Sequence, residues 1–137
     1  YSVDIGSADR VSVGSDITIV ATSYMLAEAQ RAAEQLAQES VSVELINLRS
    51  LKPWDVEMVC ASTRKTGRLL VADGGWRSFG VTAEISATVT EKLFTELKVP
   101  VGRVALPDTP APTSASLEAG YFPTADDIIQ TVKGMLR

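Results

Sequence analysis

The residues best placed to do chemistry follow an apolar run near the middle of the sequence, at residues 73–79. If that run is a strand and a helix follows, free amides around Gly74 and Gly75 could bind an anion. The segment matches neither G-x-G-x-x-G nor a P-loop ending in Lys-Ser or Lys-Thr. We therefore expect Asp73-Gly74-Gly75 to be a tight turn in which glycine permits positive φ. Trp76 and Phe79 are candidates for a contact with another domain or subunit, with packing inside the loop as the alternative.

Other polar residues have simpler structural interpretations. Asp55 and Glu57 could act as paired carboxylates, but the electrostatics of a helix start explains Asp55 without any chemistry. Arg49 could bind a carboxylate or phosphate with two parallel hydrogen bonds, and a structural ion pair is the favoured interpretation. Cys60 has no basic neighbour closer than Arg64 in the sequence, so we expect a small buried thiol.

No catalytic set emerges from these residues. Asp73 and Glu84 flank the glycine-aromatic loop without a His, Lys or metal partner nearby, so we expect a turn residue and a helix-surface residue. The sequence has no histidine and a single cysteine, which removes disulfides, zinc sites and histidine-based acid–base catalysis within this chain. The candidates that remain are contact residues.

The amino-acid composition argues against some classes of partner. The 137 residues suit one domain, and 45% hydrophobic content suits a globular core. A net charge of −4 and a pI near 4.8 argue against a nucleic-acid partner. No apolar run reaches the roughly 18 residues of a membrane span, so we expect no membrane partner and a reducing compartment. Because the sequence starts at Tyr1, we expect a fragment of a longer chain, with a processed N-terminus as the alternative.

Apolar runs alternate with helical patterns along the chain, as in a parallel sheet covered by helices. We predict a three-layer α/β/α fold with a mainly parallel sheet of about five strands, one edge strand being antiparallel. Residues 1–15 are expected to form a linker and edge strand, and residues 16–137 the domain itself. The expected strands are 17–21, 43–48, 68–72 and 101–106, and the expected helices follow residue 22, run from Pro53 to about 62, cover 80–97 and begin after a capping box at Thr124 and Asp127.

The stretch between the last strand and the last helix is rich in proline. Residues 107–112 read Pro-Asp-Thr-Pro-Ala-Pro, which can continue neither a ladder nor a helix, so we predict a stiff extended loop. Asp108 and Pro110 in this loop join Trp76, Phe79 and Arg49 as candidate subunit-interface residues.

The order of several motifs resembles the C-terminal domain of the β subunit of 2-oxo acid dehydrogenase E1 components. These motifs are Leu-Arg-Ser-Leu-Lys-Pro-Trp-Asp at 48–55, Lys-Thr-Gly-Arg at 65–68, Gly-Gly-Trp-Arg-Ser-Phe-Gly-Val at 74–81, Ala-Glu-Ile at 83–85 and Val-Pro-Val-Gly-Arg-Val at 99–104. The resemblance covers residues 10 to 136 and is closest to the pyruvate dehydrogenase branch. Transketolase and deoxyxylulose-phosphate synthase have similar last domains and remain alternatives. So does a stand-alone module that binds a small anion at the glycine-aromatic loop.

The resemblance implies a thiamine diphosphate enzyme that decarboxylates a 2-oxo acid such as pyruvate and transfers the acyl group to a lipoyl group on E2. It places thiamine diphosphate and Mg²⁺ in other parts of that enzyme, so this domain is not expected to bind either cofactor alone. Its implied partners are the E1α subunit, a second E1β subunit and the E2 subunit-binding domain, and an acidic surface suits a basic module. The implied location is the cytoplasm of a bacterium, or the mitochondrial matrix or plastid stroma of a eukaryote.

Two positions depart from the family pattern. The family commonly has a glycine near Ser23 and Tyr24, and a glutamate where Asp73 stands. We therefore expect the loop geometry at these two places to differ from the family, while the fold is retained.

Overall fold

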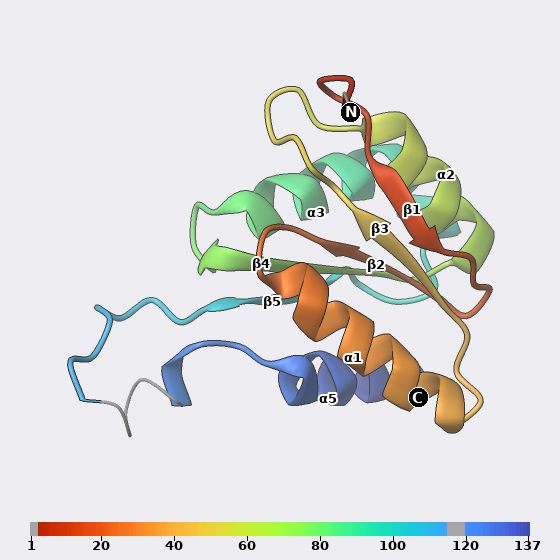
Figure 1. Ribbon diagram of the computed structural model, residues 1–137. Helices are drawn as coiled ribbons and strands as arrows, with labels where there is room; N and C mark the ends of the chain where they lie inside the picture. Colours follow the sequence, from red (N-terminus) through yellow and green to blue (C-terminus); the bar gives the residue numbers. More distant parts are fainter. Residues whose placement is uncertain (1–2, 115–119) are drawn as a thin grey trace.

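The computed structural model describes residues 3–114 and 120–137 (Figure 1). In this part of the chain a five-stranded sheet has the order β1-β3-β2-β4-β5. Only β1 runs antiparallel to its neighbour, β3, and the other three pairings are parallel. The strands are β1 (Asp9–Ser12), β2 (Ile17–Ala21), β3 (Val43–Asn47), β4 (Leu69–Trp76) and β5 (Gly102–Leu106).

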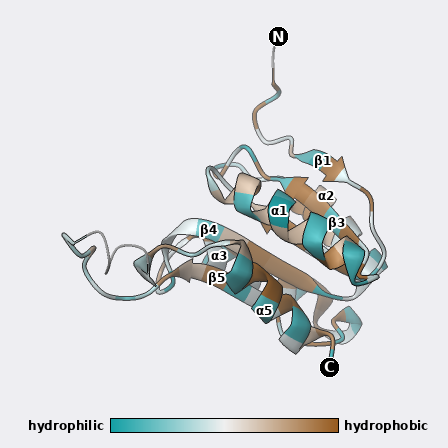
Figure 2. Cartoon of the chain, turned by 60° about the horizontal axis from the view of Figure 1, so that its bottom comes forward, coloured by the Kyte–Doolittle hydropathy of each residue, from teal (hydrophilic) through white to brown (hydrophobic). Residues whose placement is uncertain are grey.

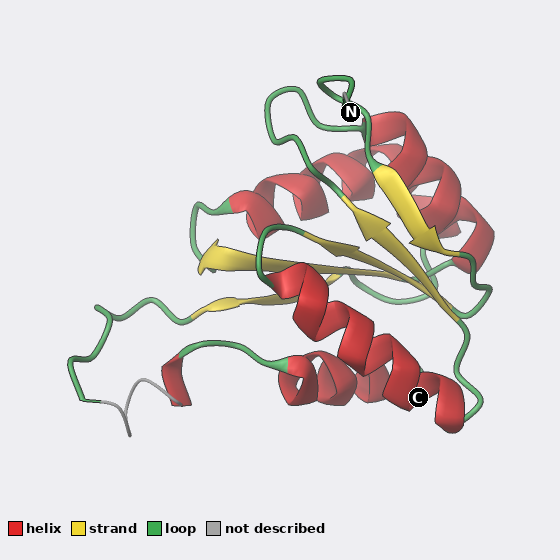
Figure 3. Ribbon diagram, viewed as in Figure 1, coloured by secondary structure: helices red, strands yellow, loops and turns green. Residues whose placement is uncertain are grey.

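Helices cover both faces of this sheet, as Figures 1 and 3 show. The helices α1 (Met25–Gln38) and α5 (Ala125–Met135) lie on one face, and α2 (Val56–Thr66) and α3 (Val81–Leu93) lie on the other. A single 3₁₀ turn, η1 (Phe94–Glu96), extends α3. The three-layer α/β/α fold with a mainly parallel sheet and an antiparallel edge strand is confirmed.

The sheet divides the core into two layers of buried side chains. Alternate residues of a strand point to opposite faces, so Ile19 packs with α1 and α5 whereas Val20 packs with α2 and α3. All five residues of β2 are buried, as expected for a central strand covered on both sides. In Figure 2 the strands are largely hydrophobic, while α1 and α5 alternate hydrophilic and hydrophobic turns.

Local signals set several helix ends. The carboxylate of Asp55 accepts a hydrogen bond from the Met58 amide at 3.0 Å and so caps α2. Gly67 ends the same helix in the left-handed conformation, with φ of 78°. Thr124 and Asp127 form the predicted capping box at the start of α5.

Three boundary predictions were wrong. Pro53 lies before the cap residue of α2 and not at the first helical position, because the Asp55 carboxylate takes the cap. The segment 73–75 is not a turn, since β4 continues to Trp76 with a register shift against β5. The helix expected over 80–97 ends at Leu93 and tightens into η1.

Among the described residues, no helix combines the length and the apolar character that crossing a bilayer requires.

Candidate functional site

Four of the five candidate interface residues meet at one place. Trp76, Phe79, Asp108 and Pro110 line a pocket with a cavity volume of about 370 Å³, together with Ser78 and Thr109. We call this the aromatic pocket. The indole of Trp76 is 58% exposed and the Phe79 side chain is fully exposed. Large apolar side chains that stand out in this way are typical of surfaces that another protein covers.

The residues that line the aromatic pocket lie at the end of β4 and in the loops that follow β4 and β5. Trp76 ends β4 and pairs with Leu106 at the end of β5, and the Arg77 amide donates to the Leu106 carbonyl at 2.9 Å. The loops after the two strands therefore leave the carboxyl edge of the sheet side by side. Connections at this edge commonly carry the functional residues of parallel sheets.

Asp108 fastens the two loops to each other. Its carboxylate accepts the Ser78 amide at 3.1 Å and the Ser78 hydroxyl at 2.5 Å. These two hydrogen bonds from Ser78, followed by the positive charges of Arg77 and Arg103, lower the pKa of Asp108. The sequence singled out Asp108 but gave no sign of Ser78, which lies 30 residues earlier.

Two glycines of the loop allow other atoms of the chain to lie where a side chain would otherwise be. A Cβ on Gly74 would lie 2.5 Å from the Tyr24 ring, and a Cβ on Gly80 would lie 1.9 Å from the Trp76 carbonyl oxygen. The prediction of positive φ at Gly74 and Gly75 was wrong, because these residues continue β4. The left-handed residue of this loop is Phe79, with φ of 60°.

Asp73 organises the start of the loop from a buried position. The Thr22 hydroxyl donates to one carboxylate oxygen of Asp73, and the Gly75 amide donates to the other at 2.7 Å. Two loop amides that an anion could have used, those of Gly75 and Ser78, are thus bonded to carboxylates of the chain itself. This arrangement favours a structural role for the loop over anion binding there.

The departure from the family pattern near Ser23 has a visible counterpart. Ser23 has φ of 51°, which is in the left-handed region that glycine adopts most easily. The next residue, Tyr24, lies against Gly74 of the neighbouring strand. Desolvation, followed by the negative charge of Asp73, raises the pKa of Tyr24.

The remaining polar candidates lie away from the aromatic pocket. Arg49 is the one interface candidate that does not reach it, and forms an ion pair with Asp9 at 3.3 Å. The second carboxylate oxygen of Asp55 accepts the Ala8 amide at 2.9 Å, so Asp55 both caps α2 and holds the segment before β1. Cys60 is buried, and this burial raises the pKa of its thiol.

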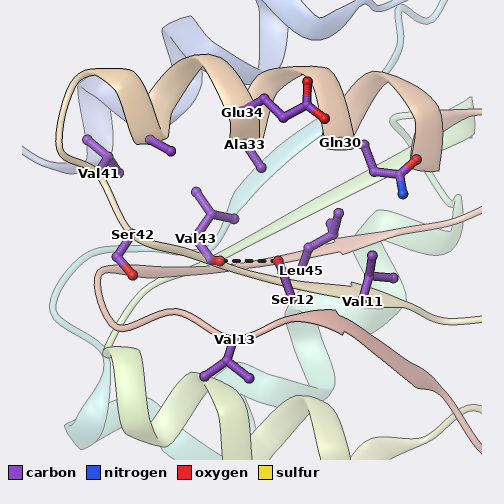
Figure 4. Close-up of a pocket in the computed structure, with 11 residues that line it drawn as sticks. Val11, Ser12, Val13, Gln30, Ala33, Glu34, Val41, Ser42, Val43 and Leu45 are labelled. Atoms are coloured by element: carbon purple, nitrogen blue, oxygen red, sulfur yellow. Dashed lines mark hydrogen bonds between the residues drawn. The ribbon is translucent and has the colours of Figure 1, made fainter.

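A second hollow lies between α1 and the edge strand β1, and Figure 4 shows the residues that line it. Its cavity volume is about 390 Å³, and Val11, Val41, Val43 and Leu45 make its walls largely apolar. The Ser12 hydroxyl donates a hydrogen bond to the Val43 carbonyl oxygen at 3.4 Å (Figure 4). Glu34 is the only ionisable lining residue. The hollow therefore has no set of groups for acid–base or nucleophilic chemistry.

Within residues 3–114 and 120–137 no three His, Cys, Asp or Glu side chains gather as metal ligands would. The carboxylates of Asp73 and Asp108 accept hydrogen bonds from hydroxyl and amide donors of the chain itself. The described residues at the aromatic pocket thus combine exposed aromatic side chains with carboxylates that the chain itself already binds.

Comparison with known proteins places the chain in a family. Residues 6–128 match the family model described as Transketolase, C-terminal domain. The chain is 44% identical over 133 residues to the mitochondrial pyruvate dehydrogenase E1 component subunit beta-1 of Arabidopsis thaliana, and 39% identical over 136 residues to the pyruvate dehydrogenase E1 component subunit beta of Staphylococcus aureus. These alignments cover 97% and 99% of this chain but only 37% and 42% of the relatives.

Solved structures agree with this placement. A split-gene transketolase, described as an inactive beta4 tetramer, superposes with a TM-score of 0.82 and 30% identity, covering 99% of this chain and 43% of that one. The 2-oxoglutarate:ferredoxin oxidoreductase of Magnetococcus marinus has a TM-score of 0.60 at 14% identity over 96% of this chain and 19% of its own, which shows a shared fold alone. The chain belongs to the transketolase C-terminal domain family.

Proposed function

We propose that the chain is the C-terminal domain of an E1β subunit of a 2-oxo acid dehydrogenase complex. The observation that carries this proposal is the 39–44% identity to pyruvate dehydrogenase E1β subunits over nearly the whole chain. The parent reaction is the oxidative decarboxylation of a 2-oxo acid such as pyruvate, with acyl transfer to lipoyl-E2. Since the chain spans about two-fifths of those relatives, this reaction belongs to the whole enzyme.

Within that enzyme the domain serves subunit assembly and E2 docking. Its partners are the E1α subunit, a second E1β subunit and the E2 subunit-binding domain. Support for assembly comes from the exposed Trp76 and Phe79 of the aromatic pocket, because tryptophan is a frequent hot-spot residue. The related split-gene transketolase is a tetramer of β chains, which is consistent with association through this domain type.

The enzymes of this family use thiamine diphosphate and Mg²⁺, but the described residues of this chain do not fit these groups. No cluster of three acidic side chains is available for Mg²⁺ among them. The Gly75 and Ser78 amides, which could have held a diphosphate, are bonded to Asp73 and Asp108. The chain alone is therefore expected neither to hold thiamine diphosphate at the glycine-aromatic loop nor to decarboxylate a 2-oxo acid. Amide chemical shifts of Gly75 and Ser78 during a titration with thiamine diphosphate test the first expectation.

The assembly role is tested by Trp76→Ala in the full-length subunit, co-expressed with E1α. Loss of a hot-spot side chain costs about 2 kcal/mol or more, so the association constant should fall by about 30-fold or more in sedimentation measurements. The domain's melting temperature should change little, because the indole is mostly exposed. Val13→Ala, which trims another exposed apolar side chain far from the aromatic pocket, is the matched control. A large loss of melting temperature with unchanged assembly would assign Trp76 to core packing.

A second candidate is the last domain of a transketolase, which the TM-score of 0.82 to the split-gene transketolase favours. The two candidates share the fold and differ in the reaction. Pyruvate decarboxylation by the full-length enzyme with E1α supports the first, and ketol transfer between sugar phosphates supports the second.

The cellular location of the protein depends on the kind of organism that produces it. We propose the cytoplasm for a bacterial protein and the mitochondrial matrix or plastid stroma for a eukaryotic one, in line with the bacterial and mitochondrial relatives. Fractionation of the source organism with antibody detection tests this assignment.

A further inference from the structure

Positive charge gathers in a second pocket between α3 and β5, whose lining shares no residue with the aromatic pocket. Its cavity volume is about 510 Å³, and its lining includes Arg77, Lys98 and Arg103 but no acidic residue. We call it the basic pocket. The whole chain has a net charge of −4, so three cations without a carboxylate among the lining residues are a local reversal of its charge.

The two arginines hold each other in place. Arg77 donates from Nη1 to the Arg103 carbonyl at 3.1 Å, and Arg103 donates from Nη1 to the Arg77 carbonyl at 3.1 Å. Each guanidinium has five N–H donors, so most of these donors remain available on both side chains. Among the described residues neither arginine has a carboxylate within ion-pair distance.

Asp108 does not neutralise this pair of arginines. Asp108 experiences the positive charge of both arginines, which contributes to its lowered pKa, but its oxygens are bonded to the amide and hydroxyl of Ser78. Two guanidinium groups with free donors, and with no carboxylate of the described residues within ion-pair distance, are suited to an oxyanion, which they can bind through bidentate hydrogen bonds.

Helix α3 adds neutral donors to the lining of the basic pocket. Ser86 and Thr90 lie one turn apart and both line the basic pocket. Within the described residues neither hydroxyl has a hydrogen-bond partner. Phe94, one further turn along, also lines this pocket and is 73% exposed. The pocket thus offers charged donors, hydroxyl donors and an aromatic ring.

We propose that the basic pocket binds a small organic phosphate, with Arg77 and Arg103 holding the phosphate and Phe94 contacting the organic part. A phosphate group carries up to two charges and several acceptor oxygens, which matches two arginines and two hydroxyls better than a single carboxylate does. The site is separate from the glycine-aromatic loop, where Asp73 and Asp108 already occupy the amides. It does not depend on the reaction of the parent enzyme.

The test titrates the 137-residue chain with pyrophosphate and with phenyl phosphate, followed by calorimetry and amide chemical shifts. We expect saturable binding, with the largest shifts at Ser86, Thr90 and Arg103. Arg77→Gln and Arg103→Gln should each weaken pyrophosphate binding by about tenfold, since a hydrogen bond to a charged group contributes about 1.5–3 kcal/mol. Arg31→Gln, which removes the same charge from the exposed face of α1, should leave it unchanged.

Two further variants keep the result interpretable if Arg103→Gln disturbs the fold. Arg77→Lys retains the charge but loses the fork of donors, so it should also weaken pyrophosphate binding. Phe94→Ala should weaken the binding of phenyl phosphate more than that of pyrophosphate. The proposal is overturned if no saturable binding occurs, if Arg31→Gln weakens binding as much as Arg77→Gln, or if citrate binds more tightly than pyrophosphate.

Discussion

The buried carboxylate of Glu44 provides a sharp test of how the edge of the sheet is held. Glu44 lies on β3 with 1% of its side chain exposed. One of its oxygens accepts hydrogen bonds from the Gly14 amide at 3.2 Å and from the Lys65 ammonium group. The other lies 3.9 Å from the Arg10 guanidinium and has no hydrogen-bond partner in the described chain. Glu44 thereby connects the chain after β1 with α2.

Glu44→Gln retains the shape of this side chain and removes its charge. Hydrogen bonds to a charged group contribute about 1.5–3 kcal/mol, whereas neutral ones contribute about 0.5–1.5 kcal/mol. Because the Lys65 side chain is 46% exposed, solvent screens its attraction and reduces the loss. We expect the free energy of unfolding at pH 7 to fall by about 1–2 kcal/mol.

The pH dependence identifies the cause. Burial alone would raise the pKa of Glu44, but Lys65, the nearby Ser62 hydroxyl and the Gly14 amide outweigh it and lower the pKa below the usual 4.5. A folded-state pKa below the unfolded one stabilises the protein fully above the unfolded value. That stabilisation is lost as the pH falls from about 4.5 through the folded-state pKa. The difference between the wild type and Glu44→Gln should therefore be constant at neutral pH and shrink in acid.

Urea unfolding followed by far-UV circular dichroism, from neutral pH down to acid, measures the loss of unfolding free energy in Glu44→Gln and its change with pH. Glu91→Gln, at an exposed position on α3, is the matched control and should have little effect at any pH. A Glu44→Gln difference that does not change with pH would refute the charge-based explanation. Stabilisation by Glu44→Gln at pH 7 would show that the desolvation of the carboxylate exceeds its hydrogen bonding.

Three further outcomes are expected. Gly80→Ala should destabilise the chain by about 1–3 kcal/mol in urea unfolding, because its Cβ would lie 1.9 Å from the Trp76 carbonyl and the backbone must shift; a neutral effect would contradict the described loop. Asp55→Ala removes the cap of α2 and the partner of the Ala8 amide and should cost about 1–2 kcal/mol, with Asp126→Ala at the start of α5 for comparison. Cys60 should react slowly with a thiol reagent until urea unfolds the chain, and fast labelling of the folded protein would argue against its burial.

The layered architecture was predictable because it depends on patterns that are local in the sequence. The unbroken apolar run of β2 and the Thr124–Asp127 capping box are examples, and both are present as expected. The end of β4 was not predictable from Gly74 and Gly75, which indicate a turn. The strand continues to Trp76, which pairs with Leu106 of β5, and Gly74 leaves room for the Tyr24 ring. Both contacts join segments far apart in the sequence, so a single sequence does not reveal them.

Residue types were enough to select most of the candidate interface residues, but not to predict which of them lie together. Exposed aromatic residues beside glycines were sufficient to select Trp76 and Phe79, which lie in the same pocket as Asp108 and Pro110. Arg49 follows the end of β3, on the far side of β2 from β4, and its partner Asp9 comes from the edge strand. The sheet order β1-β3-β2-β4-β5 decides this separation, and sequence patterns do not fix that order.

The link between Ser78 and Asp108 affects how quickly a partner could associate with the aromatic pocket. Because the loops after β4 and β5 are already bonded to each other, the surface has its shape before any partner arrives. Little conformational entropy then has to be lost in the encounter, and no slow loop rearrangement has to precede it. Association at this surface should therefore proceed by rigid docking, with a rate limited by diffusion and orientation.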